Sequence, residues 1–211
     1  MQQLKQAFGW DDFPAGPLFY EARFALRFDL GGAHKMGIAR FTQAIDRARA
    51  VASLLFADSD VLTVAVPYFG RRAASPVPAI IKRALNETGF SGTIESTRRM
   101  PPRDENDAEN DAEGLHRHLC VLEMSNRPDQ VLPFIWASVA NEMPIEPRFC
   151  CLSRAYVMDL KQGLILYPYD DRGMDVVARD PVLLRPCYDQ FGDWLLDHDR
   201  IQMDAIFASA L

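Results

Sequence analysis

A polar turn joins two apolar segments in the stretch Tyr167-Pro168-Tyr169-Asp170-Asp171-Arg172-Gly173-Met174-Asp175-Val176, which decides the C-terminal fold. Asp and Gly are typical of tight hairpins, because Asp bonds to its own backbone and Gly adopts turn dihedrals without steric cost. The apolar segments on either side predict strands over 164–169 and 174–178. A further strand is predicted over 149–160, joined to the next by Lys161-Gln162-Gly163, so the three form a β-meander.

Upstream of the meander, strand and helix patterns alternate. Residues 20–30 alternate apolar and polar side chains, the pattern of a strand with one wet face. Residues 38–56 carry apolar side chains at helical spacing, and residues 60–67 are apolar on both faces, as in a central strand. A helix is predicted to open near Ser75-Pro76 and to stop at Gly89.

The remaining segments complete the pattern. We expect short strands over 93–97 and 116–124, and a helix that starts at Pro128. Asp180-Pro181 opens another helix, and a last one runs from about residue 200 to 208. Together these elements predict an α+β fold: a mixed, mainly antiparallel sheet of about six strands flanked by helices, with a C-terminal β-meander and helix pair.

Length and composition favour a single domain spanning 1–211, since 48% of the residues are apolar. The net charge of −6 comes mainly from one segment: residues 103–113 hold one basic and six acidic side chains. We expect a mobile acidic loop near 101–114, because this segment has little apolar content to repay ordering. The seven basic residues of 71–103 are expected to neutralise it.

Several functional classes are disfavoured. The apolar runs at 61–66 and 131–139 are far shorter than the roughly 18 residues of a membrane span, and no secretory signal is visible, so we expect a cytoplasmic protein. No nucleic-acid-binding module is recognised. The four cysteines show neither a CxxC spacing nor a disulfide framework, and no cofactor is expected. The sequence does not indicate an oligomeric state.

Several segments together resemble a known family. They are Tyr20 to Leu30, the helix containing Gln43-Ala44 and Arg47-Ala48, the hairpin of 167–176, and Asp193-Trp194-Leu195-Leu196-Asp197-His198-Asp199-Arg200. Over nearly the whole chain, the sequence resembles a bacterial domain of unknown function, family 3885. The resemblance implies a bacterial setting and brings no mechanism with it. By analogy of size and build, immunity proteins that accompany toxins are a comparable class.

Two clusters are the candidate binding residues. In the hairpin turn, Asp170 and Asp171 could accept a cation or a partner's guanidinium, and Arg172 could clamp a carboxylate or phosphate. The structural alternative is an Asx turn, with Arg172 bracing the following helix through Asp193 or Asp197. The second cluster is an acidic surface near the C-terminus. Its residues Asp189, Asp193 and Asp197 are spaced i, i+4, i+8, which would place them on one helix face.

The C-terminal candidates are Asp193, Asp197, Asp199 and Arg200. We predict a non-enzymatic protein-binding domain, immunity-like or regulatory, whose acidic C-terminal surface receives a basic partner. The alternatives are a hydrolase or phosphate-binding enzyme that uses the Asp-Asp-Arg-Gly hairpin, and a structural module. No catalytic or metal-binding residues are assigned, since His116, His118 and Cys120 along one strand are better explained as a strand face than as a zinc site.

Overall fold

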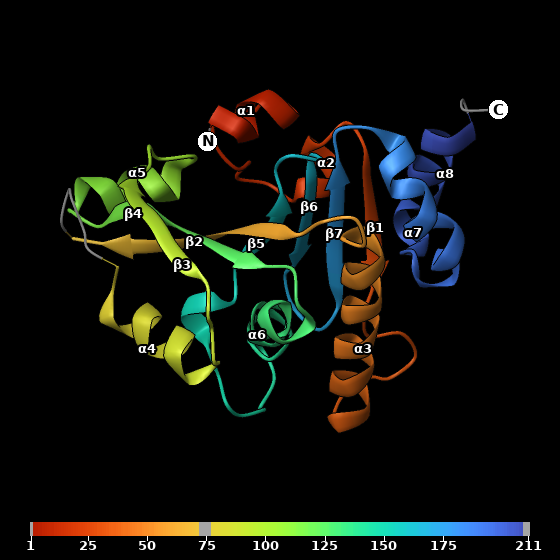
Figure 1. Ribbon diagram of the computed structural model, residues 1–211, viewed down its shortest axis with the longest axis horizontal. Helices are drawn as coiled ribbons and strands as arrows, with labels where there is room; N and C mark the ends of the chain where they lie inside the picture. The colour runs from red at the N-terminus through yellow and green to blue at the C-terminus, as the bar shows by residue number, and fades with distance from the viewer. Residues whose placement is uncertain (1, 72–76, 209–211) are drawn as a thin grey trace.

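The computed structural model describes residues 2–71 and 77–208, and its strands form one sheet in the order β1-β7-β6-β5-β2-β4-β3 (Figure 1). Every strand pairing among these residues is antiparallel. The strands are β1 (Ala25–Asp29), β2 (Val61–Gly70), β3 (Thr93–Arg99), β4 (His116–Ser125), β5 (Tyr156–Asp159), β6 (Leu164–Pro168) and β7 (Gly173–Ala178). The predicted α+β fold and meander are confirmed, while the described residues form a sheet of seven strands rather than about six.

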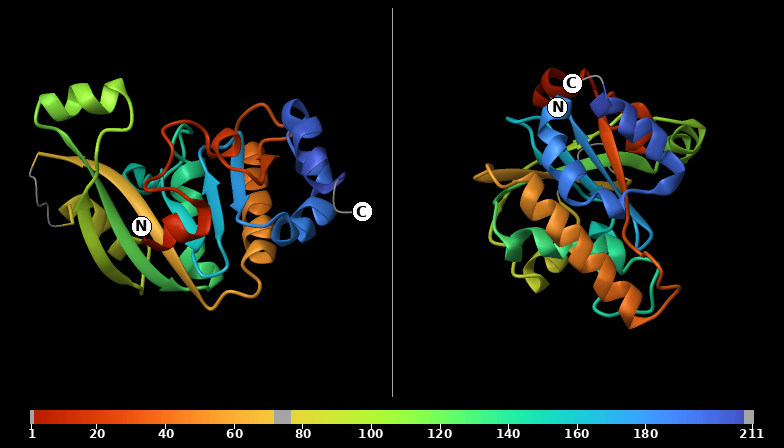
Figure 2. Two further views of the ribbon diagram at one scale, coloured as in Figure 1. Left: turned by 90° about the horizontal axis from the view of Figure 1, so that it is seen from above. Right: turned by 90° about the vertical axis from the view of Figure 1, so that its right-hand side faces the viewer.

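Helices lie on both sides of this sheet. They are α1 (Gln2–Phe8), α2 (Leu18–Glu21), α3 (Ile38–Leu55), α4 (Ala79–Glu87), α5 (Glu105–Ala112), α6 (Pro128–Val139), α7 (Arg185–Gln190) and α8 (Arg200–Ala208). Helices α3, α4 and α6 lie on one side, and the N-terminal segment with α1 and α2 lies on the other (Figure 2). Helices α7 and α8 stand beyond the β1 edge (Figure 1). No helix within the described part of the chain combines the length and apolarity that a membrane crossing needs.

The two faces of the sheet differ in chemistry because side chains alternate along each strand. The face toward α3 and α6 is apolar and buried, and it includes Leu26, Phe28, Val64, Val66, Leu122, Val157, Leu166 and Val176. On the opposite face, Arg27 lies across from Asp175, and Asp175 lies across from Tyr167. Directly opposed residues share a face. A polar and aromatic row therefore crosses the sheet under the N-terminal segment.

The acidic segment is a helix, so the prediction of a loop near 101–114 was wrong for its central part. The side chain of Asp104 caps α5 by accepting a hydrogen bond from the Asp107 amide at 2.8 Å. Acidic residues in the first turn also suit the positive end of the helix. The predicted neutralisation is confirmed at two places, since Arg99 pairs with Asp111 and Arg103 pairs with Asp107.

Several predicted boundaries also needed correction. The strand predicted over 149–160 forms only from Tyr156, after a 3₁₀ turn at Cys150–Leu152. The strand predicted over 20–30 forms only over Ala25–Asp29, because residues Leu18–Glu21 make a short helix instead. Ser75-Pro76, the predicted start of a helix, lies outside the described residues. That helix is seen from Ala79 and ends before Gly89, whose φ of 71° is the left-handed value predicted for its stop.

Candidate functional site

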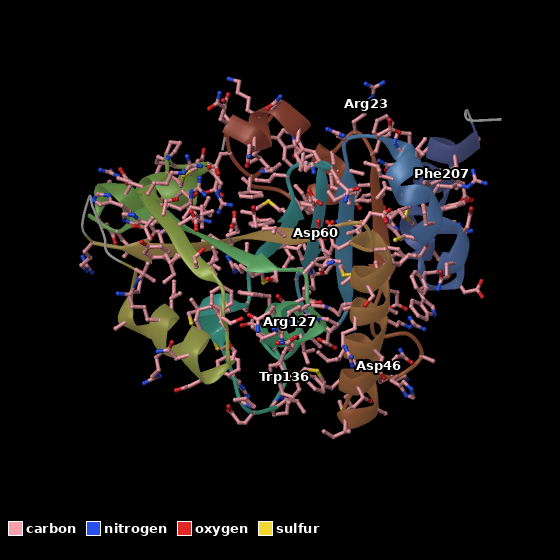
Figure 3. All side chains as sticks on the ribbon, viewed as in Figure 1. Arg23, Asp46, Asp60, Arg127, Trp136 and Phe207 are labelled. Atoms are coloured by element: carbon pink, nitrogen blue, oxygen red, sulfur yellow. The ribbon has the colours of Figure 1, made fainter. Side chains whose placement is uncertain are left out.

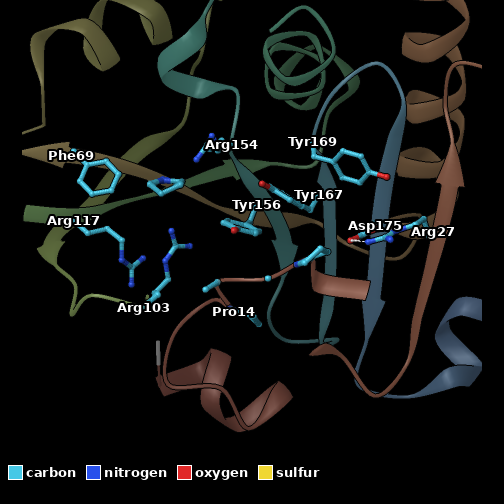
Figure 4. Close-up of a pocket in the computed structure, with 14 residues that line it drawn as sticks. Pro14, Arg27, Phe69, Arg103, Arg117, Arg154, Tyr156, Tyr167, Tyr169 and Asp175 are labelled. Atoms are coloured by element: carbon cyan, nitrogen blue, oxygen red, sulfur yellow. Dashed lines mark hydrogen bonds and ion pairs between the residues drawn. The ribbon is translucent and has the colours of Figure 1, made fainter. Parts of the chain in front are cut away.

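A cavity of about 620 Å³ opens between the polar face of the sheet and the N-terminal segment (Figure 4). Its walls come from six strands (β1, β2, β4, β5, β6 and β7), from the turn between β6 and β7, from the loops before α5 and β5, and from the segment before α2. The lining residues are Pro14, Ala15, Gly16, Pro17, Arg27, Pro67, Phe69, Arg103, Arg117, Arg154, Tyr156, Tyr167, Tyr169 and Asp175. Guanidinium groups and aromatic rings thus dominate the walls.

At one end of the cavity, Arg27 is held in a buried ionic network. Asp175 accepts two hydrogen bonds from its guanidinium, at 2.8 and 3.1 Å, and Asp199 lies 3.4 Å away (Figure 4). The second Asp175 oxygen also accepts from the Phe19 amide at 3.1 Å. Burial alone would lower the pKa of Arg27, but the hydrogen bonds and charge of Asp175 raise it above its ordinary value. Arg27 therefore has a structural role in this network.

At the other end, Arg117 is buried, with 2% of its side chain exposed. Its guanidinium pairs with Asp12 of the N-terminal segment, lies 3.4 Å from Asp107, and donates to the Pro101 carbonyl at 3.2 Å. Arg103 donates to the same Asp107 carboxylate at 3.0 Å. Two carboxylates therefore face two guanidinium groups at this end.

Arg154 adds a further positive charge. It stands just before β5, its side chain is exposed, and it lines the cavity (Figure 4). Within residues 2–71 and 77–208, no carboxylate forms an ion pair with it. With Arg103 and Arg117, three guanidinium groups thus face the two carboxylates of Asp12 and Asp107, an excess of one positive charge.

The tyrosines form the floor of the cavity. The ring of Tyr156 is stacked between Phe13, at a centroid distance of 3.9 Å, and Tyr167, at 4.4 Å. Burial raises the pKa of Tyr156, Tyr167 and Tyr169 above the ordinary phenol value. These phenols therefore stay protonated at neutral pH and remain hydrogen-bond donors.

The hairpin residues predicted to bind a partner are engaged within the protein. Asp170 accepts from the Arg172 amide at 2.7 Å and from its Nε at 2.8 Å, while Arg172 also reaches Glu142 at 3.4 Å. The prediction that Arg172 braces Asp193 or Asp197 was wrong, because the turn directs it toward Asp170 instead. Asp171 pairs with Arg40 and so ties the hairpin to α3. The predicted Asx-type turn is confirmed by the bond from Asp170 to the amide of Arg172.

The C-terminal candidates are dispersed. Helix α7 ends at Gln190 and Leu195 is extended, so the prediction that Asp189, Asp193 and Asp197 share one helix face was wrong. Asp199 is buried against Arg27 and Tyr20, and Arg200 bonds to Asp204 and to the Gly192 carbonyl. Asp193 and Asp197 remain exposed, and neither forms an ion pair with another described residue.

The strand of His116, His118 and Cys120 belongs to the fold rather than to the cavity. His116 contacts Asp111 at 2.7 Å, and His118 stacks on Tyr68 with ring centroids 5.1 Å apart. His118 is fully buried, and Cys120 on the same face of the strand is buried as well.

Sequence reasoning missed Arg27, Arg117, Arg154, Tyr156 and Tyr167 as site residues. A signal existed for Arg27, which alternates with apolar residues in a stretch that we interpreted as a strand with one wet face. Nothing local marks Arg154, because its importance depends on strands that meet only in the folded sheet.

The fold and cavity define an α+β protein in which α3, α4 and α6 cover the apolar face of an antiparallel sheet, and an arginine- and tyrosine-lined cavity lies between the opposite face and the N-terminal segment. The chain belongs to the family described as "Domain of unknown function (DUF3885)", whose model matches residues 1–199. It is also similar to "Uncharacterized protein YnaE" of Bacillus subtilis (strain 168), with 28% identity over 93 residues, 42% of this chain. The matched part spans 44% of that relative's length. No solved structure matches the chain.

Proposed function

We propose that this protein is a non-enzymatic binding domain that takes up a small organic anion, with a phosphate or carboxylate group, in the cavity on the polar face of the sheet. The observation that carries the proposal is Arg154, an exposed guanidinium on the cavity wall without a carboxylate partner among the described residues. A guanidinium offers paired N–H donors that match two oxygens of a carboxylate or phosphate.

The surroundings of Arg154 support an anionic ligand. Tyr167 and Tyr169 are protonated donors on the same wall, and the cavity volume of about 620 Å³ lies within the roughly 300 to 1,000 Å³ typical of small-molecule sites. The apolar surfaces of Phe69, Pro14 and Pro67 suit a carbon skeleton. The lining carboxylate, Asp175, is fully buried and held by Arg27, which favours binding over acid–base catalysis.

Replacing the unpaired cation should remove much of the affinity. We expect Arg154→Ala to weaken the binding of inorganic phosphate or of glutarate by about ten- to a hundredfold, because a charge-assisted hydrogen bond contributes roughly 1.5 to 3 kcal/mol. Isothermal titration calorimetry with each ligand in a separate arm measures the effect and shows whether phosphate or carboxylate is preferred.

Arg127→Ala is the matched control. Arg127 is exposed at the start of α6 (Figure 3) and pairs with Asp129 at 2.9 Å. Helix α6 lies on the opposite side of the sheet from the N-terminal segment that walls the cavity (Figure 2). Removal of Arg127 lowers the net charge equally and should leave affinity nearly unchanged. Absence of binding to the wild-type protein in both arms, or equal affinities for the two variants, would refute the proposal.

A basic protein partner is the second candidate, favoured by the exposed and unpaired carboxylates of Asp193 and Asp197 described above. Asp199 no longer belongs to this surface because it is buried against Arg27. We expect Asp193→Asn with Asp197→Asn to release a basic partner recovered by pull-down from the native cell, while the fold stays intact. Recovery of the same stoichiometric partner by this variant would argue against an acidic docking surface.

A further inference from the structure

We infer that Asp12 occupies an inner anion subsite on Arg117, and that the ligand carries two acidic groups, the second of which takes the place of the Asp12 carboxylate. This inference rests on the proposed function and specifies its ligand class. The outer group would meet Arg154, and the inner group would meet Arg117.

First, the carboxylate that pairs with Arg117 comes from a distant part of the sequence. Asp12 lies 105 positions away in the sequence and reaches the guanidinium across the cavity wall. A buried guanidinium needs an anion, because taking an unpaired charge out of water is costly. Asp107 lies at 3.4 Å and is shared with Arg103, so it neutralises Arg117 only in part.

The second observation is the nature of the segment that carries Asp12. Residues 10–17, which we call the strap, contain no helix or strand, and residues 15–17 are exposed. The strap forms one wall of the cavity through Pro14 to Pro17. Its inward contacts include the stack of Phe13 on Tyr156, the ion pair of Asp12 with Arg117, and the packing of Trp10 against the core. An irregular surface segment of this kind rearranges at lower cost than a strand of the sheet.

Third, exchanging Asp12 for an acidic group of the ligand keeps the charge of Arg117 balanced. If a ligand's carboxylate or phosphate replaces Asp12, Arg117 keeps an anionic partner and the Asp12 carboxylate gains full hydration. Such an exchange avoids leaving a buried charge unpaired, which is the costly outcome. A ligand with one acidic group would bind Arg154 and leave Asp12 in place. Ligands with two acidic groups should therefore bind more tightly than their single-acid counterparts.

Two ligand pairs test the inference by calorimetry: pyrophosphate with inorganic phosphate, and glutarate with butyrate. In Asp12→Asn the neutral amide competes weakly for Arg117, so affinity for the two-acid member of the preferred pair should rise about tenfold, with a smaller gain for the single-acid member. Tenfold corresponds to about 1.4 kcal/mol, close to the lower end of what one charge-assisted hydrogen bond contributes.

Asp11→Asn is the matched control, because Asp11 is the neighbouring carboxylate, is exposed, and pairs with Lys5 at 2.8 Å. Both variants change the net charge equally, and only Asp12 contacts Arg117. Equal affinities of the two variants for the two-acid ligand, with wild-type binding intact, would overturn the inference and leave the proposed function standing. Failure of the wild-type protein to bind any of the four ligands would instead overturn the proposed function.

A measurement on the wild-type protein covers the case in which Asp12→Asn does not fold. Amide hydrogen exchange of residues 10–17 should become faster when the two-acid ligand binds, because the strap loses its ion pair with Arg117. Unchanged or slower exchange at saturating ligand would contradict the displacement of Asp12.

Discussion

Replacement of Asp175 by alanine is expected to destabilise the protein by about 3 to 5 kcal/mol, since breaking a buried ion pair leaves the remaining charge without compensation. Asp175 is fully buried and accepts hydrogen bonds from Arg27 and from the Phe19 amide. Its loss would leave Arg27 with Asp199 alone, at 3.4 Å. Urea denaturation followed by circular dichroism gives the change in the free energy of unfolding.

Two further variants make this result specific. Asp175→Asn keeps an oxygen that can accept from the Phe19 amide and removes the charge, so its loss of stability should be smaller. Asp189→Ala removes an exposed carboxylate that pairs with Arg185 at 2.9 Å, and should cost about 0.5 kcal/mol or less. A cost for Asp175→Ala no larger than that of Asp189→Ala would contradict the structural role of the network.

Tyr156→Ala should also cost about 3 to 5 kcal/mol, as buried aromatic truncations do. The side chain is 5% exposed and stacks on both Phe13 and Tyr167, so its removal opens a void between the sheet and the strap. The unfolding free energy measured by chemical denaturation checks the size of the effect.

Tyr156→Phe distinguishes the contribution of the ring to stability from that of the hydroxyl. It keeps both stacking contacts and should leave stability within about 1 kcal/mol of the wild-type value, in keeping with volume-conserving replacements. If the alanine variant were as stable as the phenylalanine variant, Tyr156 would not be a packing element of the cavity floor.

Much of the fold was predictable from sequence because its signals are local. The helix of α3 follows from apolar spacing over 18 residues, and the meander follows from the turns at Lys161-Gln162-Gly163 and Asp170 to Gly173. Strand β3 was predicted too short and α5 was missed, because their stability depends on pairing with β4 and on the cap supplied by Asp104. Neither contact follows from hydrophobic pattern.

The candidate site was less predictable because its residues meet through strand order. Arg27 and Asp175 are 148 positions apart and become neighbours only when β1 pairs with β7. The aspartates counted as an acidic surface include Asp199, which is buried against Arg27. Residue type indicated an acidic protein surface, whereas the folded chain brings the loop that carries Arg154 to the wall of a cavity.

Anion binding at Arg154 should be visible in the guanidinium signals of this residue. In ¹H–¹⁵N spectra of the wild-type protein, assigned with Arg154→Ala, titration with the preferred phosphate or carboxylate ligand should shift the Arg154 Nε–Hε resonance saturably. The resonance of Arg127, on the far side of the sheet, should stay in place. An Arg154 signal that does not move, or that moves no more than the Arg127 signal at saturating ligand, would contradict anion binding at Arg154.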